Sequence, residues 1–132
     1  MNWDEFDKEI QALQSRIDWT PDIIVGIVRG GLVPARLLST ELNVKEMYAL
    51  TVKKVGDERK VMSEVLEDLR DKEILLVEDM LETGKSLMVA KEYLESKGAE
   101  VKTACLYTMP QSEIVPDFSL KQVNEVVHFP WE

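Results

Sequence analysis

The chain has 132 residues, of which 45% are hydrophobic and 31% charged, and its formal net charge is −9 at pH 7. This length and composition predict one soluble globular domain over residues 1–132. The acidic balance argues against a nucleic-acid groove or an anionic membrane surface, because both partners favour concentrated Lys and Arg. No signal peptide or membrane-length apolar run is recognisable, and the single cysteine, Cys105, can form no intramolecular disulfide, so we expect a cytoplasmic protein with a buried thiol.

The first predicted element is a helix whose apolar residues recur at alternating spacings of three and four, namely Trp3, Phe6, Ile10, Leu13 and Ile17. Either Asn2 or Asp4 can cap its start. Residues 22–28, DIIVGIV, then form a short aliphatic run that is typical of a strand buried on both faces. The glycines of Arg29-Gly30-Gly31 end this strand, and residues 33–42 predict a second helix with Pro34 in its first turn.

The middle of the chain predicts a second strand at residues 46–55 that leads into a mobile loop at residues 56–60, GDERK. For residues 61–69 the pattern fits either a short helix or a strand. Residues 73–79, EILLVED, have the strongest strand pattern, because ILLV is bounded by charge on both sides. A helix over residues 85–97 follows, with its inward face formed by Leu87, Ala90, Tyr93 and Leu94 and its end marked by Lys97-Gly98.

Residues 101–109, VKTACLYTM, predict a further strand that stops at Pro110, and the tail from residue 122 is expected to be extended as far as Pro130. Short buried strands that alternate with helices indicate an α/β fold with a parallel twisted sheet and helices on both faces. In such sheets, ligands bind beyond the carboxyl ends of the strands. Two turns of this sequence fall at that edge.

The first of these turns is Arg29-Gly30-Gly31. Its glycines let the backbone approach a ligand, and the Arg29 guanidinium and the backbone amides suit a phosphate or a pyrophosphate. The alternative is a tight strand-to-helix turn in which Arg29 is only solvated. These residues alone do not decide between the two interpretations.

The second turn lies within residues 74–86, ILLVEDMLETGKS. Thr83-Gly84-Lys85-Ser86 begins a helix whose free amides favour an anion, but Asp79 stands where a nucleotide P-loop needs a glycine. Glu78 and Asp79 can accept hydrogen bonds from vicinal hydroxyls, and a phosphate beside a diol is what a ribose 5-phosphate presents. Taken singly, Glu78 and Asp79 could be a solvated strand end, and Glu82 and Thr83 ordinary helix caps. Their occurrence together at one edge of the sheet favours a binding site.

Three segments resemble those of a known family. Residues 77–86, VEDMLETGKS, closely resemble the phosphoribosyl pyrophosphate signature of type I phosphoribosyltransferases, and residues 25–39, VGIVRGGLVPARLLS, resemble the pyrophosphate loop of that family. The terminal HFPWE is similar to the ending of small purine phosphoribosyltransferases of the xanthine, guanine and hypoxanthine type. The resemblance implies the type I phosphoribosyltransferase fold, with a small C-terminal extended segment over the site, and a homodimer.

The resemblance also implies an activity in nucleotide salvage. The ribose 5-phosphate group of phosphoribosyl pyrophosphate would pass to a nucleobase, most simply a purine, which forms a nucleoside monophosphate and releases pyrophosphate. Glu78, Asp79 and Glu82 would be the catalytic residues, and Mg²⁺ would be held by Glu78 and Asp79 mainly through the substrate. The segment around residues 55–60 would be a lid that excludes water, with Lys53, Lys54, Arg59 or Lys60 near the pyrophosphate.

The resemblance assigns binding roles residue by residue. The ribose hydroxyls would meet Glu78 and Asp79, and the pyrophosphate would meet Arg29, Gly30 and Gly31. The 5-phosphate would lie in a cradle formed by Glu82, Thr83, Gly84, Lys85 and Ser86. The base would be bound by Met109, Val126, Val127 and Trp131, and the alternative for Trp131 is a hydrophobic anchor of the tail or a dimer contact.

Three positions depart from the pattern of the purine enzymes, and all three are on the base side. Glu82 replaces the usual aspartate, Met109 replaces a lysine that reads the 6-oxo group, and Val126 replaces an aromatic residue that stacks on the base. The leading hypothesis is therefore a small purine-type phosphoribosyltransferase whose preferred base is open. The alternatives are a non-catalytic regulator that binds phosphoribosyl pyrophosphate or a nucleotide, and a transferase for another base.

Overall fold

The computed structural model describes all 132 residues and contains three helices and eight strands. The helices are α1 (Trp3–Arg16), α2 (Leu32–Glu41) and α3 (Lys85–Ser96). The strands are β1 (Ile23–Val28), β2 (Met47–Val55), β3 (Glu58–Val61), β4 (Glu73–Val77), β5 (Met80–Leu81), β6 (Glu100–Ala104), β7 (Tyr107–Thr108) and β8 (Lys121–Gln122). None of the helices is both long enough and apolar enough to cross a bilayer.

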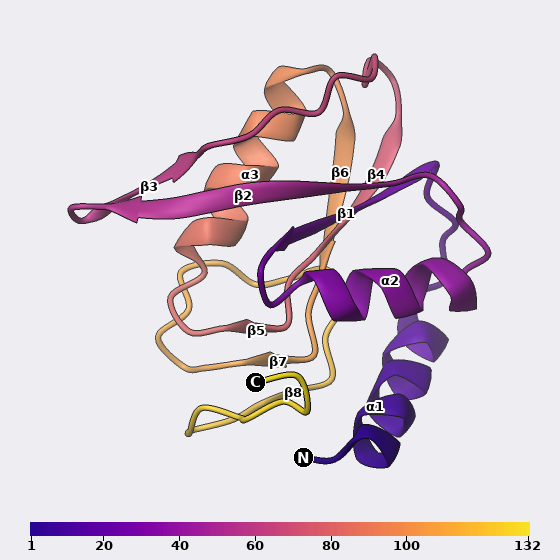
Figure 1. Ribbon diagram of the computed structural model, residues 1–132, viewed down its shortest axis with the longest axis vertical. Coiled ribbons are helices and arrows are strands. Elements are labelled where there is room, and N and C mark those ends of the chain that lie inside the picture. The colour runs from indigo at the N-terminus through magenta and orange to yellow at the C-terminus, as the bar shows by residue number, and fades with distance from the viewer.

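The strands form two sheets (Figure 1). The large sheet has the order β3-β2-β1-β4-β6, in which β2, β1, β4 and β6 are parallel and β3 is antiparallel to β2. The small sheet has the order β5-β7-β8 and is parallel throughout. Because β5 directly follows β4 and β7 directly follows β6, the small sheet lies beyond the carboxyl ends of these two strands. The prediction of a mainly parallel sheet is confirmed.

Helices cover both faces of the large sheet, as the sequence predicted. α1 and α2 pack on one face and α3 on the other, and each face has its own cluster of 14 buried residues. Strand β1 contributes to both clusters, since Ile24 belongs to one and Ile23 and Val25 belong to the other. This arrangement follows from a strand whose residues are aliphatic on both sides and which lies in the middle of the sheet.

Helix α1 begins as predicted, with an Asn2 cap. The Asn2 side chain accepts from the Glu5 amide at 2.8 Å and the Glu5 side chain accepts from the Asn2 amide at 3.2 Å, which is a complete capping box. Four of the five residues on the predicted apolar face are buried, but Trp3 is 54% exposed. Trp3 is the first residue of the helix, so its side chain reaches beyond the edge of the core, where it contacts the rings of Phe6 and Trp131.

The prediction of a loop at residues 56–60 is wrong for residues 58–60, and only Gly56 and Asp57 form a turn. Residues 58–61 form β3, which pairs with β2 in a hairpin whose register sets Lys54 opposite Arg59 and Val52 opposite Val61. Gly56, with φ of 63°, supplies the turn. The strand escaped the sequence pattern because the hairpin extends past the other strands, so its polar residues are solvated. After Val61 the chain is irregular, which answers the open question over residues 61–69.

The prediction of one strand over residues 101–109 is also wrong in detail. The segment divides into β6, which pairs with β4, and β7, which pairs with β5, with Cys105 and Leu106 between them. All residues from Thr103 to Tyr107 are buried, so the apolar run continues across the change of sheet and gives no sign of it. The tail contains only the short β8 and then bends, with a turn at Pro130-Trp131, so it is not extended to Pro130.

Candidate active site at the carboxyl edge of the sheet

The two predicted turns lie side by side. β1 and β4 are parallel neighbours, with Gly26 opposite Val77, so the turn after β1 and the carboxylate pair after β4 emerge at the same edge. The contact is close, because a Cβ placed on Gly30 would lie 2.2 Å from Asp79 Oδ2. The peptide bond between Val28 and Arg29 is cis. The structure thus brings together two of the segments that the sequence singled out.

The two glycines of this turn have different surroundings. A Cβ on Gly31 would lie 2.3 Å from the Val77 carbonyl oxygen, and the Gly31 amide donates to the Ile27 carbonyl at 2.9 Å. Gly31 is buried, so it is needed for packing the turn against β4. Gly30 and the exposed Arg29 instead line a cavity of about 620 Å³, which they share with Asp79, Trp131 and Glu132.

A second cavity of about 220 Å³ lies over the start of α3. It is lined by Glu78, by Arg59 from the hairpin and by residues 80–87, which include all of the predicted 5-phosphate residues. Gly84 precedes the helix with φ of 79°, and a Cβ there would lie 2.5 Å from the Cγ2 atom of Ile114, so no other residue fits without rearrangement. Within the chain, the amides of Ser86 and Leu87 donate to no acceptor. Free amides at the positive end of a helix favour an anion.

The carboxylates of Glu78 and Asp79 lie in a partly buried position. The pKa of Glu78 is raised well above its ordinary value, first by burial and then by the charge of Asp79. Burial also raises the pKa of Asp79, although the Met80 amide, which donates to Asp79 Oδ1 at 2.6 Å, opposes this effect. The ion pairs of the structure join Arg70 to Asp68 and His128 to Glu132, so neither Glu78 nor Asp79 has a cationic partner.

The backbone of the carboxylate pair is held by the neighbouring strand segment. The Glu78 amide donates to the Ala104 carbonyl and the Leu106 amide donates to the Asp79 carbonyl, each at 3.0 Å. These bonds lie at the junction where both chain segments pass from the large sheet to the small one. The pair is therefore positioned by β4, by β6 and by the small sheet together.

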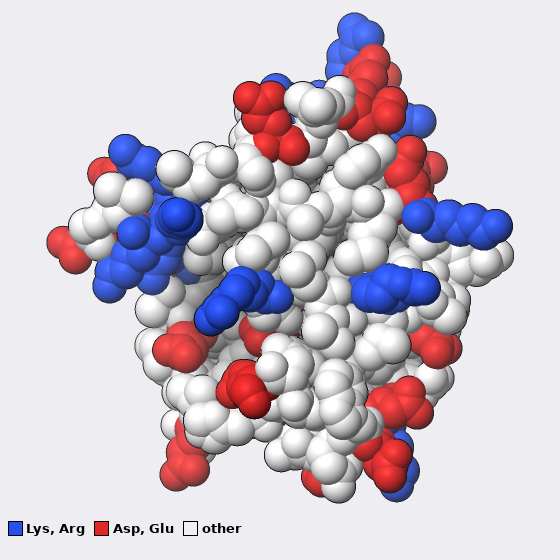
Figure 2. All heavy atoms as spheres, in the orientation of Figure 1, with Lys and Arg blue, Asp and Glu red and all other residues white.

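The predicted lid residues separate into two groups. Arg59 lines the 220 Å³ cavity and also a neighbouring cavity of about 280 Å³ beside α3, whereas Lys53, Lys54 and Lys60 line neither. Figure 2 shows Lys and Arg side chains gathered over the β2–β3 hairpin. Along β3 only Arg59 and Val61 are partly buried, so they share the face toward the body of the protein. Side chains alternate between the two faces of a strand, so Arg59 is on the same face as the apolar Val61. This is the sequence signal that could have identified Arg59 as the residue facing the site.

The predicted base residues are not gathered in one place. Trp131 lines the 620 Å³ cavity, but Met109, Val126 and Val127 line neither that cavity nor the one over α3. Val126 is 48% exposed. The Met109 amide donates to the Leu81 carbonyl at 2.8 Å, which places Met109 beside the segment that leads into Glu82. Glu132, which sequence reasoning missed, lines the 620 Å³ cavity, and no internal spacing in the sequence pointed to it.

Trp131 belongs to an aromatic stack that holds the tail. Its ring lies parallel to that of Phe129, with centroids 4.8 Å apart, and edge-on to that of Phe6 at the same distance. The Tyr107 ring is also nearly parallel to that of Phe129, with centroids 6.1 Å apart, and its hydroxyl donates to Glu9 at 2.6 Å. The stack joins α1, β7 and the tail, so Trp131 anchors the segment that forms one wall of the cavity.

Comparison with known proteins identifies the family. A family model described as the phosphoribosyl transferase domain matches residues 4–132. The xanthine-guanine phosphoribosyltransferase of Cereibacter sphaeroides (strain ATCC 17025 / ATH 2.4.3) is 29% identical over an alignment of 146 residues, which covers all of this chain and 85% of that protein.

Solved structures agree with this result. The crystal structure of a purine phosphoribosyltransferase from Pyrococcus horikoshii is 34% identical, with a TM-score of 0.93 and coverage of 100% of this chain and 91% of that one. The xanthine-guanine-hypoxanthine phosphoribosyltransferase of Helicobacter pylori shares the fold, with a TM-score of 0.88 at 23% identity and coverage of 99% and 91%. The fold and the enzyme class predicted from the sequence are confirmed: the chain belongs to the phosphoribosyltransferase family.

Proposed function

We propose that this enzyme transfers the ribose 5-phosphate group of phosphoribosyl pyrophosphate to a purine base, which yields a nucleoside monophosphate and pyrophosphate. One observation carries the proposal: Glu78 lines the cavity over the start of α3, and its neighbour Asp79 lines the cavity against the Arg29–Gly30 turn. In phosphoribosyl pyrophosphate the ribose hydroxyls lie between the 5-phosphate and the pyrophosphate. The two carboxylates lie in the same way between the two cavities. The names of the relatives from Cereibacter sphaeroides and Pyrococcus horikoshii support a purine as the acceptor.

The cavity over α3 suits the 5-phosphate. The free amides of Ser86 and Leu87 would donate to its oxygens, and the hydroxyls of Thr83 and Ser86 can add further donors. Arg59 would close this cavity from the hairpin. The carboxylates of Glu78 and Asp79, which have no cationic partner, would accept hydrogen bonds from the ribose hydroxyls.

The cavity lined by Arg29 and Gly30 suits the pyrophosphate. Gly30 leaves the backbone accessible and the Arg29 guanidinium offers several N–H donors to one anion. The reaction breaks the bond from C1 of the ribose to the pyrophosphate oxygen and forms a bond from C1 to a ring nitrogen of the base. Positive charge develops on the sugar ring during this exchange, so the nearby carboxylates stabilise it. Glu82, on the rim of the adjacent cavity, is the group that can take the proton which the base nitrogen loses.

The residues present fit a Mg²⁺ ion that is bound mainly through the substrate. Two adjacent carboxylates whose pKa values are raised by burial, with no Lys or Arg paired to them, are suited to a hard cation. The chain has no cluster of three or more His, Cys, Asp or Glu side chains that could hold a metal by itself. Glu78 and Asp79 would therefore supply part of the coordination and the diphosphate the rest. When bound, the ion would neutralise charge on the leaving pyrophosphate.

The base side supports a second candidate function. Met109 and Val126 stand where purine enzymes carry a lysine and an aromatic residue, and neither lines the cavities described above. A regulator that binds phosphoribosyl pyrophosphate or a nucleotide, without transfer, would keep the phosphoribosyl side and lose the base side. A transferase for a base other than a purine would show the same asymmetry.

A base panel separates these functions. The purified protein is incubated with phosphoribosyl pyrophosphate, Mg²⁺ and adenine, guanine, hypoxanthine, xanthine or uracil, and pyrophosphate release is measured. We expect release with at least one purine. Release with uracil alone would contradict a purine acceptor. Tight binding of phosphoribosyl pyrophosphate with no release for any base would favour the regulator.

A matched pair of variants tests the role of the carboxylates. Asp79→Asn should weaken phosphoribosyl pyrophosphate binding by about 1–3 kcal/mol, the range for losing a charge-assisted hydrogen bond. Asp71→Asn, at an exposed position away from both cavities, should leave the affinity unchanged. Isothermal titration calorimetry measures both. Equal affinities in the two variants would show that Asp79 has a structural role.

We further infer that the enzyme is a homodimer, which the family resemblance predicts. Sedimentation equilibrium should then give twice the 15.1 kDa mass of the chain. A mass that stays at the monomer value up to high concentration would contradict this inference.

A further inference from the structure

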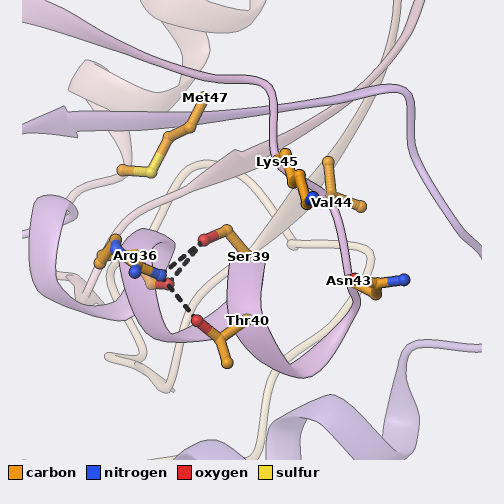
Figure 3. Close-up of a pocket in the computed structure, with 7 residues that line it drawn as sticks. All are labelled: Arg36, Ser39, Thr40, Asn43, Val44, Lys45 and Met47. Atoms are coloured by element: carbon orange, nitrogen blue, oxygen red, sulfur yellow. Dashed lines mark hydrogen bonds between the residues drawn. The ribbon is translucent and has the colours of Figure 1, made fainter.

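A third cavity lies away from the phosphoribosyl site. It has a volume of about 510 Å³ and is bordered by the second half of α2, by residues 43–45 and by Met47 at the start of β2 (Figure 3). The Arg29–Gly30 turn precedes the first residue of α2, whereas this cavity lies along its second half. Its lining shares no residue with the two cavities assigned to the substrate.

The residues that line this cavity are positively charged, whereas the protein as a whole is acidic. The chain has 25 acidic and 16 basic residues, yet the lining contains Arg36 and Lys45 and no carboxylate. Neither cation forms an ion pair. The neighbouring Glu41 is engaged elsewhere, because its Oε1 atom accepts from Gln11 Nε2 on α1 at 2.9 Å. Two unpaired cations beside one cavity in an acidic protein favour an anionic ligand.

Arg36 is held in position by hydroxyl groups. One terminal nitrogen of its guanidinium donates to Thr40 Oγ1 at 2.6 Å and to Ser39 Oγ at 3.2 Å (Figure 3), and Ser39 Oγ in turn donates to the Arg36 carbonyl at 2.7 Å. These bonds leave the Nε atom and the other terminal nitrogen of Arg36 free to donate. The Thr40 hydroxyl accepts from Arg36 and still has its own proton to offer. The cavity therefore presents oriented donors.

The backbone beside the cavity is also well defined. The amides of Asn43 and Val44 donate to the carbonyls of Thr40 and Ser39 at 3.1 and 2.9 Å, and Val44 is only 6% exposed. Asn43 takes the left-handed conformation, with φ of 56°, which ends α2 and turns the chain toward β2. A ligand would thus meet a preformed wall and would not have to order a loop.

We propose that this cavity binds a small molecule that carries a phosphate group, at a site separate from the phosphoribosyl site. A guanidinium with free N–H groups can bind two phosphate oxygens, while Lys45 adds a mobile point charge and Thr40 adds a hydroxyl. The volume exceeds that of a phosphate ion and falls within the range of about 300–1,000 Å³ that is typical of ligand sites. Met47, which is partly exposed, offers an apolar surface to the remainder of the ligand. This proposal does not depend on the base specificity or on the activity of the enzyme.

Nuclear magnetic resonance tests the proposal residue by residue, with inorganic phosphate as the probe. Phosphate is titrated into ¹⁵N-labelled protein while sodium chloride keeps the ionic strength constant. We expect saturable shifts of the amides of residues 39–47, in addition to those of residues 83–87 that respond through the substrate site. Residues 39–47 report on the proposed cavity and residues 83–87 on the substrate site. Absence of binding at one site is therefore distinguishable from absence of binding at the other.

Variants of the cavity residues show which side chains cause the shifts of residues 39–47. Arg36→Gln combined with Lys45→Gln should weaken the response of residues 39–47 by about tenfold or more, because each lost charge-assisted contact is worth roughly that factor. The response of residues 83–87 should stay unchanged, which also shows that the variant is folded. Arg36 and Lys45 are exposed, and so is Lys8 on α1, which serves as the control position. Lys8→Gln removes one positive charge and should alter neither response.

Two results would overturn the proposal. The first is the absence of saturable shifts at residues 39–47 in the unmodified protein. The second is an unchanged affinity at these residues in the double variant, which would show that neither cation of the cavity binds the phosphate.

Discussion

Replacing Gly30 by alanine tests whether the pyrophosphate turn acts on the carboxylate pair. The added Cβ would lie 2.2 Å from Asp79 Oδ2 and 2.6 Å from its Cγ, whereas ordinary contacts begin near 3.4 Å. Relief of this contact requires a displacement of about 1 Å, and the Asp79 carboxylate, at the end of its side chain, is the group that can move. No positive φ restricts Gly30, so an alanine there meets this contact and no backbone penalty.

The magnitude follows from the displacement. A misplacement of about 1 Å in a group that positions the substrate lowers the rate by roughly a hundredfold, which corresponds to about 2.7 kcal/mol of lost transition-state stabilisation. We expect kcat/KM for phosphoribosyl pyrophosphate to fall by this factor, while the midpoint of thermal unfolding changes little because both Gly30 and Asp79 are partly exposed. Pyrophosphate release with the preferred base is the assay, and calorimetric affinity for phosphoribosyl pyrophosphate is the second measurement.

A double-mutant cycle shows whether the effect passes through Asp79. In an Asp79→Ala background the carboxylate that meets the new Cβ is absent, so Gly30→Ala should have little further effect on affinity. The reasoning is refuted if Gly30→Ala is as active as the unmodified enzyme. It is equally refuted if Gly30→Ala weakens binding by the same factor with and without the Asp79 carboxylate.

Three further predictions concern the tail, the buried thiol and the base side. Phe129→Ala should lower the free energy of unfolding by about 3–5 kcal/mol in chemical denaturation, whereas Val126→Ala, at a half-exposed position, should change it by less than about 0.5 kcal/mol. Cys105 is buried, and burial together with the charges of Glu78 and Asp79 raises its thiol pKa, so at pH 8 a disulfide reagent should modify it at least roughly 100-fold faster in urea than in the native state. Equal rates would contradict this. Met109→Lys should raise kcat/KM for a 6-oxopurine by about tenfold if residue 109 faces the base, and no gain in a folded variant would count against that placement.

Local patterns predicted the helices and the central strands well, because their signals lie in consecutive residues. The Asn2 cap, the aliphatic β1 and the break at Gly98 each combine a distinct residue type with a distinct conformation. The turn of Arg29–Gly31 and the carboxylate pair could be placed at one edge for the same reason, since parallel neighbours bring their carboxyl ends together. To predict that these two segments meet, it was enough to know the direction of the strands, and no contact between residues remote in sequence was needed.

Other features depend on contacts that are remote in sequence. The change of sheet at Cys105 is invisible because both sheets bury that segment. The role of Gly31 comes from the Val77 carbonyl, which approaches from another strand. Trp131 could be interpreted as a base residue or as an anchor, and its ring contacts with Phe129 and Phe6 settle only the second of these roles. For Val126 and Met109, the family pattern supplied positions, and the structure places neither in the cavities assigned to the phosphoribosyl part of the substrate.

Around the junction at which β4 and β6 leave the large sheet, the positions proposed for the sugar phosphate and those proposed for the base lie in different segments of the chain. The turns after β1, β4 and β5 hold the residues proposed for the sugar phosphate, the portion of the reaction that any nucleobase acceptor would share. The segment after β7 and the tail carry the positions proposed for the base, and backbone bonds such as those from the Glu78 amide to Ala104 and from the Leu106 amide to Asp79 join the two parts. Because backbone bonds tolerate substitution of the side chains around them, a lineage could exchange one acceptor for another without rebuilding the phosphoribosyl site. Glu82, Met109 and Val126 show where such an exchange would be recorded.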